Sequence, residues 1–465
     1  CKALAAAAVA ALVATESATA AAHVLLSLVF LGWVALRGLA LMHRDDASQH
    51  CAAGADRDLP RYTIVVPLYR EAQMVAPLLD ALGALDYPRE KLEILLVVED
   101  DDAETRRAIT AVGVPPHVKV VVAPAIGPRT KPKALNVALP FALGDYLVVY
   151  DAEDQPEPGQ LRQAVAAFRT GSRALACVQA RLAIENAKDG WLTQLFAGEY
   201  AGQFDVLLPM VTAHHLPLPL GGTSNHFRLD VLRRVGGWDA FNVTEDADLG
   251  IRLARFGWQT GLIASTTWEE APRHLPAWLK QRTRWFKGWM QTWLVHMRQP
   301  RRLQGDLGFA GFLAFQLMIG GSVLSALVHP VFVLALALQA ATGLVAAGDG
   351  LGAVLTGLTI ATLVFGYAVS AALVLAGLAR RRLLSIGWVV ATLPVYWLLL
   401  SAAAWRAAWQ LAVDPFHWEK TEHGFARTSV RPKPAPKESR NRQGPRGAAA
   451  RWRAQPAGKS ARKAG

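Results

Sequence analysis

A run of aliphatic and β-branched residues, YTIVVPL, occupies positions 62–68 and is typical of a strand buried on both faces of a parallel sheet. Similar runs follow at 92–98 (LEILLVV), 118–122 and 146–150 (YLVVY), and residues 71–85 have the apolar spacing of a helix. Strands that alternate with helices predict an α/β fold, a mostly parallel doubly wound sheet whose site lies at the carboxyl ends of the strands.

Acidic residues follow two of these strands. Residues 99–102 read EDDD after the second strand, and residues 151–154 read DAED after the fourth. Carboxylates held close together repel one another, and Mg²⁺ or Mn²⁺ relieves that repulsion by taking oxygen ligands from carboxylates and substrate phosphates. Either cluster alone is equally well explained as a solvated acidic loop.

Three more segments carry charged or aromatic groups that suit a diphosphate site. Lys131-Pro-Lys133 lies between the two acidic clusters, and Thr244-Glu245-Asp246 follows a glycine turn at 236–238. Residues 281–285 (QRTRW) lie in a basic, tryptophan-rich stretch. Because Trp, Lys and Arg favour the headgroup zone, residues 275–298 are also predicted to form an amphipathic helix at the membrane interface.

Apolar flanks surround this domain. Hydrophobic residues make up 52% of the chain and charged residues only 18%, and the apolar excess falls outside the middle of the sequence. We therefore predict an N-terminal transmembrane region at 1–45, a cytoplasmic catalytic domain at 58–300 and C-terminal transmembrane helices at 307–413. The alanine-rich residues 1–14 suit either a second span or a signal-like segment.

The number of C-terminal crossings has two solutions. Residues 307–348 carry no charge and are long enough for two crossings with a turn near His329-Pro330, which gives four crossings and a cytoplasmic tail but places residues 380–382 (RRR) outside. If residues 307–348 cross the membrane only once, these arginines lie in the cytoplasm, but the basic C-terminal tail lies outside. We expect four.

The net charge of +12 comes largely from the tail. Residues 425–465 are basic with almost no apolar periodicity, which predicts a disordered segment suited to an anionic leaflet rather than to nucleic acid. The three cysteines share no motif spacing. The chain begins at Cys1 rather than at Met, which is compatible with a fragment of a longer product.

Five signals in order resemble the membrane-integrated, cellulose-synthase-like glycosyltransferases of family 2, over about residues 60–300. They are residues 66–71 (VPLYRE), the acidic end of the second strand, Asp151-Ala-Glu153, Thr244-Glu245-Asp246 and Gln281-x-x-Arg284-Trp285. The resemblance implies a GT-A fold inserted between transmembrane helices, in a multi-pass protein of the bacterial inner membrane with its catalytic domain in the cytoplasm.

The resemblance also implies a donor site. The residues expected to bind the nucleotide-sugar are Pro67, Tyr69, Glu71, Asp100, Lys133, Asp151 and Arg284. Asp151 and Glu153 match the metal-binding DxD pair. The second position departs from the commoner Asp, so Asp151 could bind the metal with Glu153 or Asp154 assisting.

On the acceptor side, the resemblance assigns Asp246 as the general base, within the motif that includes Thr244 and Glu245. Trp285, Gln281 and Ser224 are expected to contact the acceptor.

One base and direct displacement predict an inverting transfer. The expected donor is a nucleotide-diphosphate sugar, a UDP-sugar by resemblance, and GDP donors remain open. The expected acceptor is a growing β-linked glycan, which could be coupled to export through unidentified secretion partners. The alternatives are transfer of one sugar to a lipid-linked acceptor, with membrane lipid as a partner, and a membrane scaffold or receptor with a transferase-like domain.

Overall fold

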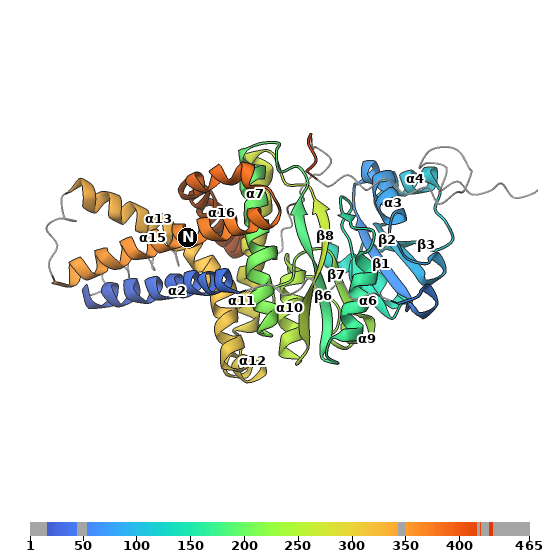
Figure 1. Ribbon diagram of the computed structural model, residues 1–465, viewed down its shortest axis with the longest axis horizontal. Coiled ribbons are helices and arrows are strands. Elements are labelled where there is room, and N and C mark those ends of the chain that lie inside the picture. Colours follow the sequence, from blue (N-terminus) through green and yellow to red (C-terminus); the bar gives the residue numbers. More distant parts are fainter. Residues whose placement is uncertain (1–15, 44–53, 343–349, 416–418, 420–426, 431–465) are drawn as a thin grey trace, which may run out of the picture.

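The computed structural model describes residues 16–43, 54–342, 350–415, 419 and 427–430. Within these ranges an α/β domain is joined to a group of long helices that project from one side of it (Figure 1). The predictions for residues 1–14 and for most of the basic tail at 425–465 lie outside the described residues.

The sheet has eight strands in the order β3-β2-β1-β4-β7-β6-β8-β5. β1 pairs in parallel with β2 and β4, and β2 with β3, so the four predicted strands form one parallel half. β7 runs antiparallel to β4 and β6, β6 runs parallel to β8, and β5 runs antiparallel to β8. The strands are β1 Tyr62–Leu68, β2 Leu92–Glu99, β3 Val118–Ala123, β4 Tyr146–Val149, β5 Gln155–Pro156, β6 Leu175–Ile184, β7 Asn225–Arg228 and β8 Gln259–Glu269.

Helices cover both faces of the sheet, as a doubly wound fold requires. Alternate residues of β1 divide between two cores, because successive side chains of a strand point to opposite faces. Ile64 and Val66 pack with Leu78 of α3 and Leu161 of α6. Val65 packs on the other side, with residues of α5, α7 and α10.

Apart from α11, which has 22 residues, the helices of the α/β domain have 12 residues or fewer. The domain contains α3 Val75–Gly83, α4 Ala103–Val112, α5 Lys131–Ala138, α6 Gln160–Thr170, α7 Trp191–Gly202, α8 Leu208–Ala213, α9 Leu229–Arg234, α10 Glu245–Arg255 and α11 Leu275–His296. Shorter turns are η1 Asp56–Asp58, η2 Ala72–Met74, η3 Arg89–Lys91, η4 Leu139–Phe141 and the π-helical η5 Gln203–Leu207.

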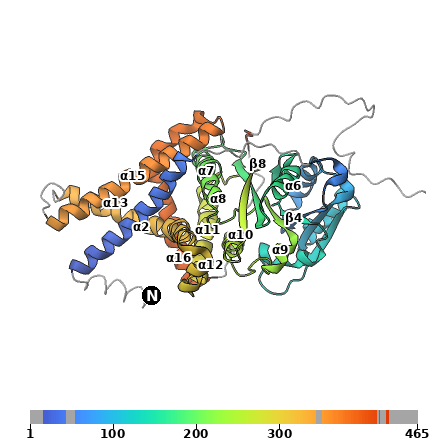
Figure 2. The same ribbon diagram turned by 60° about the horizontal axis from the view of Figure 1, so that its bottom comes forward.

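Among the described residues, four helical segments are long and apolar enough to cross a membrane, at Ala18–Met42, Pro300–Ala341, Gly350–Arg380 and Leu384–Val413. They comprise α2 Glu16–Met42, then α12 Pro300–Phe315, the π-helical η6 Gln316–Gly321 and α13 Ser322–Ala341, then α15 Gly350–Arg380, then η7 Leu384–Thr392 and α16 Leu393–Val413. In both views α2, α13 and α15 lie side by side and point away from the sheet (Figures 1 and 2).

The expected turn near His329-Pro330 is wrong. Pro330 lies inside α13, which continues to Ala341. Proline removes one backbone donor, and neighbouring groups inside a helix bundle compensate for that loss in apolar surroundings. Beyond a kink at Gly308, residues 309–341 are continuously helical, and the described residues contain three C-terminal segments of spanning length instead of four.

The last of these segments returns to the α/β domain at both ends. At its start, Trp191 Nε1 donates to Thr392 Oγ1 at 2.8 Å. Beyond its end, Gln291 Nε2 donates to the Pro415 carbonyl at 2.8 Å. Thr428 Oγ1 then donates to Asp189 Oδ1 at 2.7 Å. Residues near both ends of Leu384–Val413 therefore contact the α/β domain.

The end of α15 is also fixed to this domain. Arg381 pairs with Asp205 and donates to the Leu182 carbonyl at 2.8 Å, while Arg380 donates to the Asp205 carbonyl. Gly377 lies so close to α7 that a Cβ there would collide with the backbone of Ala201. The helix backbones therefore touch directly.

Candidate functional site

A cavity of about 230 Å³ opens at the carboxyl ends of β1, β2 and β4, where the doubly wound fold predicts a site. Most of the residues singled out in the sequence line it. They are Pro67, Tyr69, Glu71, Asp151, Glu153, Thr244, Glu245, Asp246, Gln281, Arg284 and Trp285. Segments far apart in the chain therefore meet in one space.

Lys131, the first residue of α5, lies at the centre of the cavity. Its ammonium pairs with Asp151 and donates to the Gly222 carbonyl at 2.6 Å. A Cβ placed on Gly222 would lie 3.4 Å from Asp246 Oδ2 and 4.0 Å from Asp151 Oδ2. Asp151, Asp246 and Lys131 therefore converge on the backbone of Gly222.

Acidic side chains outnumber basic ones around the cavity, nine to four. Burial, followed by the charge of Asp151, raises the pKa of Glu153 to about 8. Burial, followed by Glu153, raises the pKa of Glu269 to about 8. Burial, followed by Asp246, raises the pKa of Glu245 to about 7. A diphosphate would add negative charge, so its binding here requires a cation.

The carboxylate oxygens of Asp151 and Glu153 are of the kind that a divalent cation such as Mg²⁺ takes as ligands. No group of three or more His, Cys, Asp or Glu side chains in the described ranges forms a complete set of metal ligands. A Mg²⁺-type site needs fewer protein ligands, because one or two carboxylates share the ion with substrate phosphates. The residues therefore fit a metal that binds together with the donor.

Asp246 has one carboxylate oxygen without a partner. Its Oδ1 is buried and forms no hydrogen bond to any described residue. Burial raises the pKa of this carboxyl, against the lowering effect of hydrogen bonds from the start of α10 and of the Lys131 charge. A buried acceptor without a hydrogen bond costs free energy, so this oxygen is available to accept a hydrogen bond from a ligand hydroxyl.

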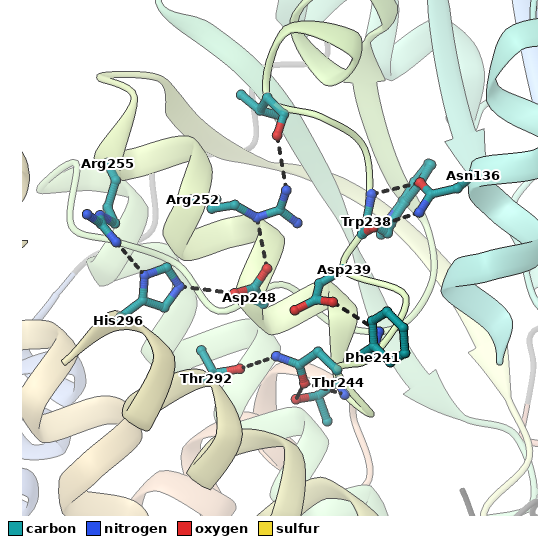
Figure 3. A network of polar contacts seen from close by, with 12 residues as sticks. Asn136, Trp238, Asp239, Phe241, Thr244, Asp248, Arg252, Arg255, Thr292 and His296 are labelled. Carbon is teal, nitrogen blue, oxygen red and sulfur yellow. Dashed lines mark hydrogen bonds and ion pairs between the residues drawn. The ribbon is translucent and has the colours of Figure 1, made fainter. Parts of the chain in front are cut away.

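A buried network holds α10 against α11 (Figure 3). Arg255 Nη1 lies 3.0 Å from His296 Nδ1, and His296 Nε2 lies 3.1 Å from Asp248 Oδ1. Because a guanidinium only donates, Nδ1 accepts, and Nε2 carries the proton that it donates to Asp248. Arg252 Nε donates to the second Asp248 oxygen at 2.8 Å. This network fixes the helix that begins with Glu245 and Asp246.

Gly288 of α11 lies against Thr244, the first residue of the Thr244-Glu245-Asp246 motif. The space that a Cβ would need at Gly288 is filled by the side chain of Thr244. Asn242 Nδ2 also donates to Thr292 Oγ1 of α11 at 3.0 Å, and Thr244 N donates to Asn242 Oδ1 at 3.0 Å (Figure 3). The helix that carries Arg284 and Trp285 thereby positions Asp246.

Arg282 is buried behind Trp285. Its Nη1 donates to Glu199 Oε1 at 2.7 Å, and its guanidinium carbon lies 4.6 Å from the Trp285 ring centroid. It also lies 4.3 Å from the Phe196 ring centroid. A guanidinium between two aromatic rings gains cation–π stabilisation. Arg282 therefore fixes the Trp285 ring at the cavity wall.

Three of the residues predicted for the site lie elsewhere. Asp100 is exposed at 3.5 Å from Arg106, and Lys133 is buried in an ion pair with Glu99 at 2.6 Å. Ser224 is in the core, where its hydroxyl donates to Thr267 Oγ1 at 2.6 Å. Glu99, Lys131 and Thr223 line the cavity in their place. The acceptor and donor roles expected of the three remain predictions from resemblance.

Lys131, Glu199 and Arg282 were missed as site residues by the sequence reasoning. Lys131 belongs to the K-P-K segment, in which the resemblance indicates only Lys133. Glu199 belongs to α7, an apolar segment in which a lone carboxylate gives no motif. Arg282 stands inside the QRTRW segment, in which the resemblance indicates Arg284.

Comparison with solved structures shows the class of fold. The chain is similar to the mannosyltransferase PcManGT from Pyrobaculum calidifontis, solved in complex with GDP-Man and Mn²⁺. The two superimpose with a TM-score of 0.52 and 20% identity over 85% of this chain and 99% of the other. The described α/β domain thus has the GT-A class of fold, flanked by helices of membrane-spanning length.

The family is defined by the sequence. Residues 60–288 match the family described as glycosyltransferase like family 2, and this part of the chain is a family 2 glycosyltransferase domain.

Two curated relatives share this region. The probable glycosyltransferase YdaM of Bacillus subtilis is 26% identical over 57% of this chain and 64% of its own length. The beta-monoglucosyldiacylglycerol synthase of Synechocystis sp. is 27% identical over 56% of this chain and 55% of its own length. The chain therefore spans less than two thirds of either relative.

Proposed function

We propose that this protein transfers a sugar from a nucleotide-diphosphate donor to an acceptor hydroxyl, with inversion at the anomeric carbon. The observation that carries the proposal is the convergence of Asp151, Lys131 and Asp246 on Gly222. A carboxylate for the acceptor and a charged diphosphate site for the donor thereby share one cavity. A scaffold with no catalytic role would not need buried, unsatisfied carboxylate oxygens there.

Asp246 takes the proton of the acceptor hydroxyl as that oxygen attacks the anomeric carbon, and the bond to the nucleoside diphosphate breaks on the opposite side. Lys131 and Arg284 stabilise the negative charge that develops on the departing diphosphate. Mg²⁺ or Mn²⁺ held by Asp151 and Glu153 would supply further positive charge to it when bound. The Trp285 ring offers an apolar face to the acceptor sugar or headgroup.

The family match supports a transferase, and the four long apolar helices support a membrane location, which we propose to be the bacterial inner membrane with the α/β domain in the cytoplasm. Extension of a β-linked glycan and addition of one sugar to a lipid-linked acceptor would use the same catalytic residues. Product length after incubation with donor separates the two.

The test is an assay of purified membranes with radiolabelled UDP-glucose, UDP-N-acetylglucosamine and GDP-Man. Each donor is tested with Mg²⁺, with Mn²⁺ and after chelation of divalent ions, and GDP-Man and Mn²⁺ are included because the mannosyltransferase of similar fold was solved with them. We expect one donor to be consumed in a metal-dependent way. Incorporation that survives chelation would refute the metal site.

Asp246→Asn should lower the rate about 10²–10⁴-fold, the usual contribution of a positioned base. The matched control is Asp230→Asn, which changes an exposed residue of α9 that pairs with Arg234, one helical turn later, at 2.6 Å. An Asp246→Asn protein as active as the control would sink the proposed mechanism.

A further inference from the structure

A second cavity lies between the catalytic site and the long helices. It has a volume of about 190 Å³ and is lined by residues of α2, α7, α11, α13, α15 and α16. Six residues line both cavities, namely Glu199, Gln203, Pro219, Arg282, Trp285 and Trp289. The two cavities therefore adjoin at these side chains, and the second lies on the side of the helices that project in Figure 2.

The walls of this second cavity are mainly apolar where the long helices form them. Met318 and Ile319 of η6, Leu373 and Val374 of α15, and Leu400 of α16 contribute aliphatic side chains. Such surfaces suit hydrocarbon chains. A sugar chain threaded along the same path would leave its hydroxyls facing side chains that form no hydrogen bonds.

Polar atoms inside the second cavity lack partners. His329 is 1% exposed, its Nε2 is hydrogen-bonded to Tyr367 at 2.6 Å, and its Nδ1 has no partner among the described residues. The buried hydroxyl of Ser325, one turn earlier, is likewise unpartnered within the described ranges. Buried polar atoms of this kind normally have a partner, which points to a bound molecule.

Arg37 places a positive charge in the same cavity. It belongs to the apolar helix α2, and its Nη1 donates to Ser370 Oγ of α15 at 2.9 Å. No ion pair to Arg37 occurs in the described part of the chain, whereas Arg282 is paired with Glu199 at 2.7 Å. An ionised residue in a membrane-spanning helix is costly and usually marks the path of a substrate.

We propose that the second cavity binds the acceptor, a lipid with a phosphate-bearing head. Its hydrocarbon chain lies among α2, α13 and α15, its phosphate contacts Arg37, and a hydroxyl of its head reaches past Trp285 to Asp246. This inference rests on the proposed transferase function and chooses the lipid acceptor over an exported polymer. The transfer forms a glycosidic bond to that hydroxyl, releases the nucleoside diphosphate and passes the hydroxyl proton to Asp246.

The test uses the full chain in its native membranes with the radiolabelled donor that proves active. Product is divided into lipid extracted by chloroform and methanol, ethanol-insoluble polymer and released nucleotide. We expect the label in the lipid fraction, retained on an anion exchanger. Label in the polymer fraction, or in a lipid that the exchanger does not retain, overturns the proposal.

Arg37→Leu should lower the initial rate of labelled-lipid formation about tenfold or more, the effect of losing one charge-assisted hydrogen bond. Arg37→Lys should restore part of that rate. Ser325→Leu should also lower the rate by filling the cavity, whereas Val331→Leu on the exposed face of α13 is the control. An unchanged rate of labelled-lipid formation in both Arg37→Leu and Ser325→Leu overturns the proposal. Failure of the transferase function gives a different result, with no nucleotide released by any variant.

Discussion

A substitution at Gly288 tests whether α11 positions Asp246, the proposed catalytic base. In Gly288→Ala, the new Cβ would lie 2.5 Å from Thr244 Cγ2 and 2.7 Å from Thr244 Cβ, whereas ordinary contact begins at 3.4 Å. Rotation of the Thr244 side chain can move Cγ2 but cannot move Cβ. The backbones at Gly288 and Thr244 must therefore move apart by about 0.7 Å, the shortfall at Cβ, and Asp246 lies only two residues beyond Thr244.

A displacement of about 1 Å in a catalytic group costs about 10²-fold in rate, so we expect Gly288→Ala to lose most of its transfer activity. Overpacking also costs about 1–3 kcal/mol of stability, which is visible as a lower midpoint of thermal unfolding. The assay is donor-dependent nucleotide release in membranes at matched protein level, alongside thermal unfolding in detergent.

A compensating change separates this effect from misfolding. Thr244→Gly removes the three atoms nearest to the new Cβ, so the double variant Thr244→Gly, Gly288→Ala should recover activity relative to Gly288→Ala alone. The control is Gly305→Ala in α12, where a Cβ meets nothing within 4 Å. Wild-type activity in Gly288→Ala, or no recovery in the double variant, would refute the reasoning.

Three further predictions concern the charge in the cavity, the buried network and the arrangement of the helices. Lys131→Met should lower kcat/KM about 10²–10³-fold, as loss of a group that stabilises transition-state charge does, while Lys119→Met on the surface leaves it unchanged. Burial alone would raise the pKa of Asp248, but hydrogen bonds from His296 and Arg252 hold it below its usual value. Its contribution to stability is therefore present above the unfolded pKa of about 4 and is lost as the pH falls below that value. Asp248→Asn should cost about 3–5 kcal/mol at pH 7, seen as a lower unfolding midpoint, and the difference should shrink below about pH 4. In a chain with its native cysteines replaced, Leu384→Cys and Ser429→Cys should react with an impermeant thiol reagent from the same side of sealed vesicles, and Thr342→Cys from the opposite side. Labelling of Leu384→Cys and Ser429→Cys from different sides would show that α16 crosses the membrane.

The parallel half of the sheet could be predicted because its strands are continuous apolar runs such as β1 and β2. The antiparallel half could not. β7 is only four residues long and carries Asn225, His226 and Arg228, so its strand form depends on pairing with β4 and β6, which are far away in sequence. Local pattern gives no signal for such a strand.

The sequence predicts which segments line the site, but not always which side chain of a segment faces it. β2 extends to Glu99, so the alternation of the strand turns Glu99, and not Asp100, into the cavity. Lys131 and Lys133 share one turn of α5, and only the three-dimensional position of that helix decides which lysine meets Asp151. Ser224 has a positive φ of 57°, which no pattern in the sequence indicates.

The contact between Gly377 and the backbone of α7, together with the Arg381–Asp205 pair, joins α15 directly to the α/β domain. In the membrane-bound transferase that we propose, this rigid connection would fix the distance between Asp246 and the lipid core. Acceptors whose reactive oxygen lies at a different depth should then react more slowly, whatever the chemistry of their head.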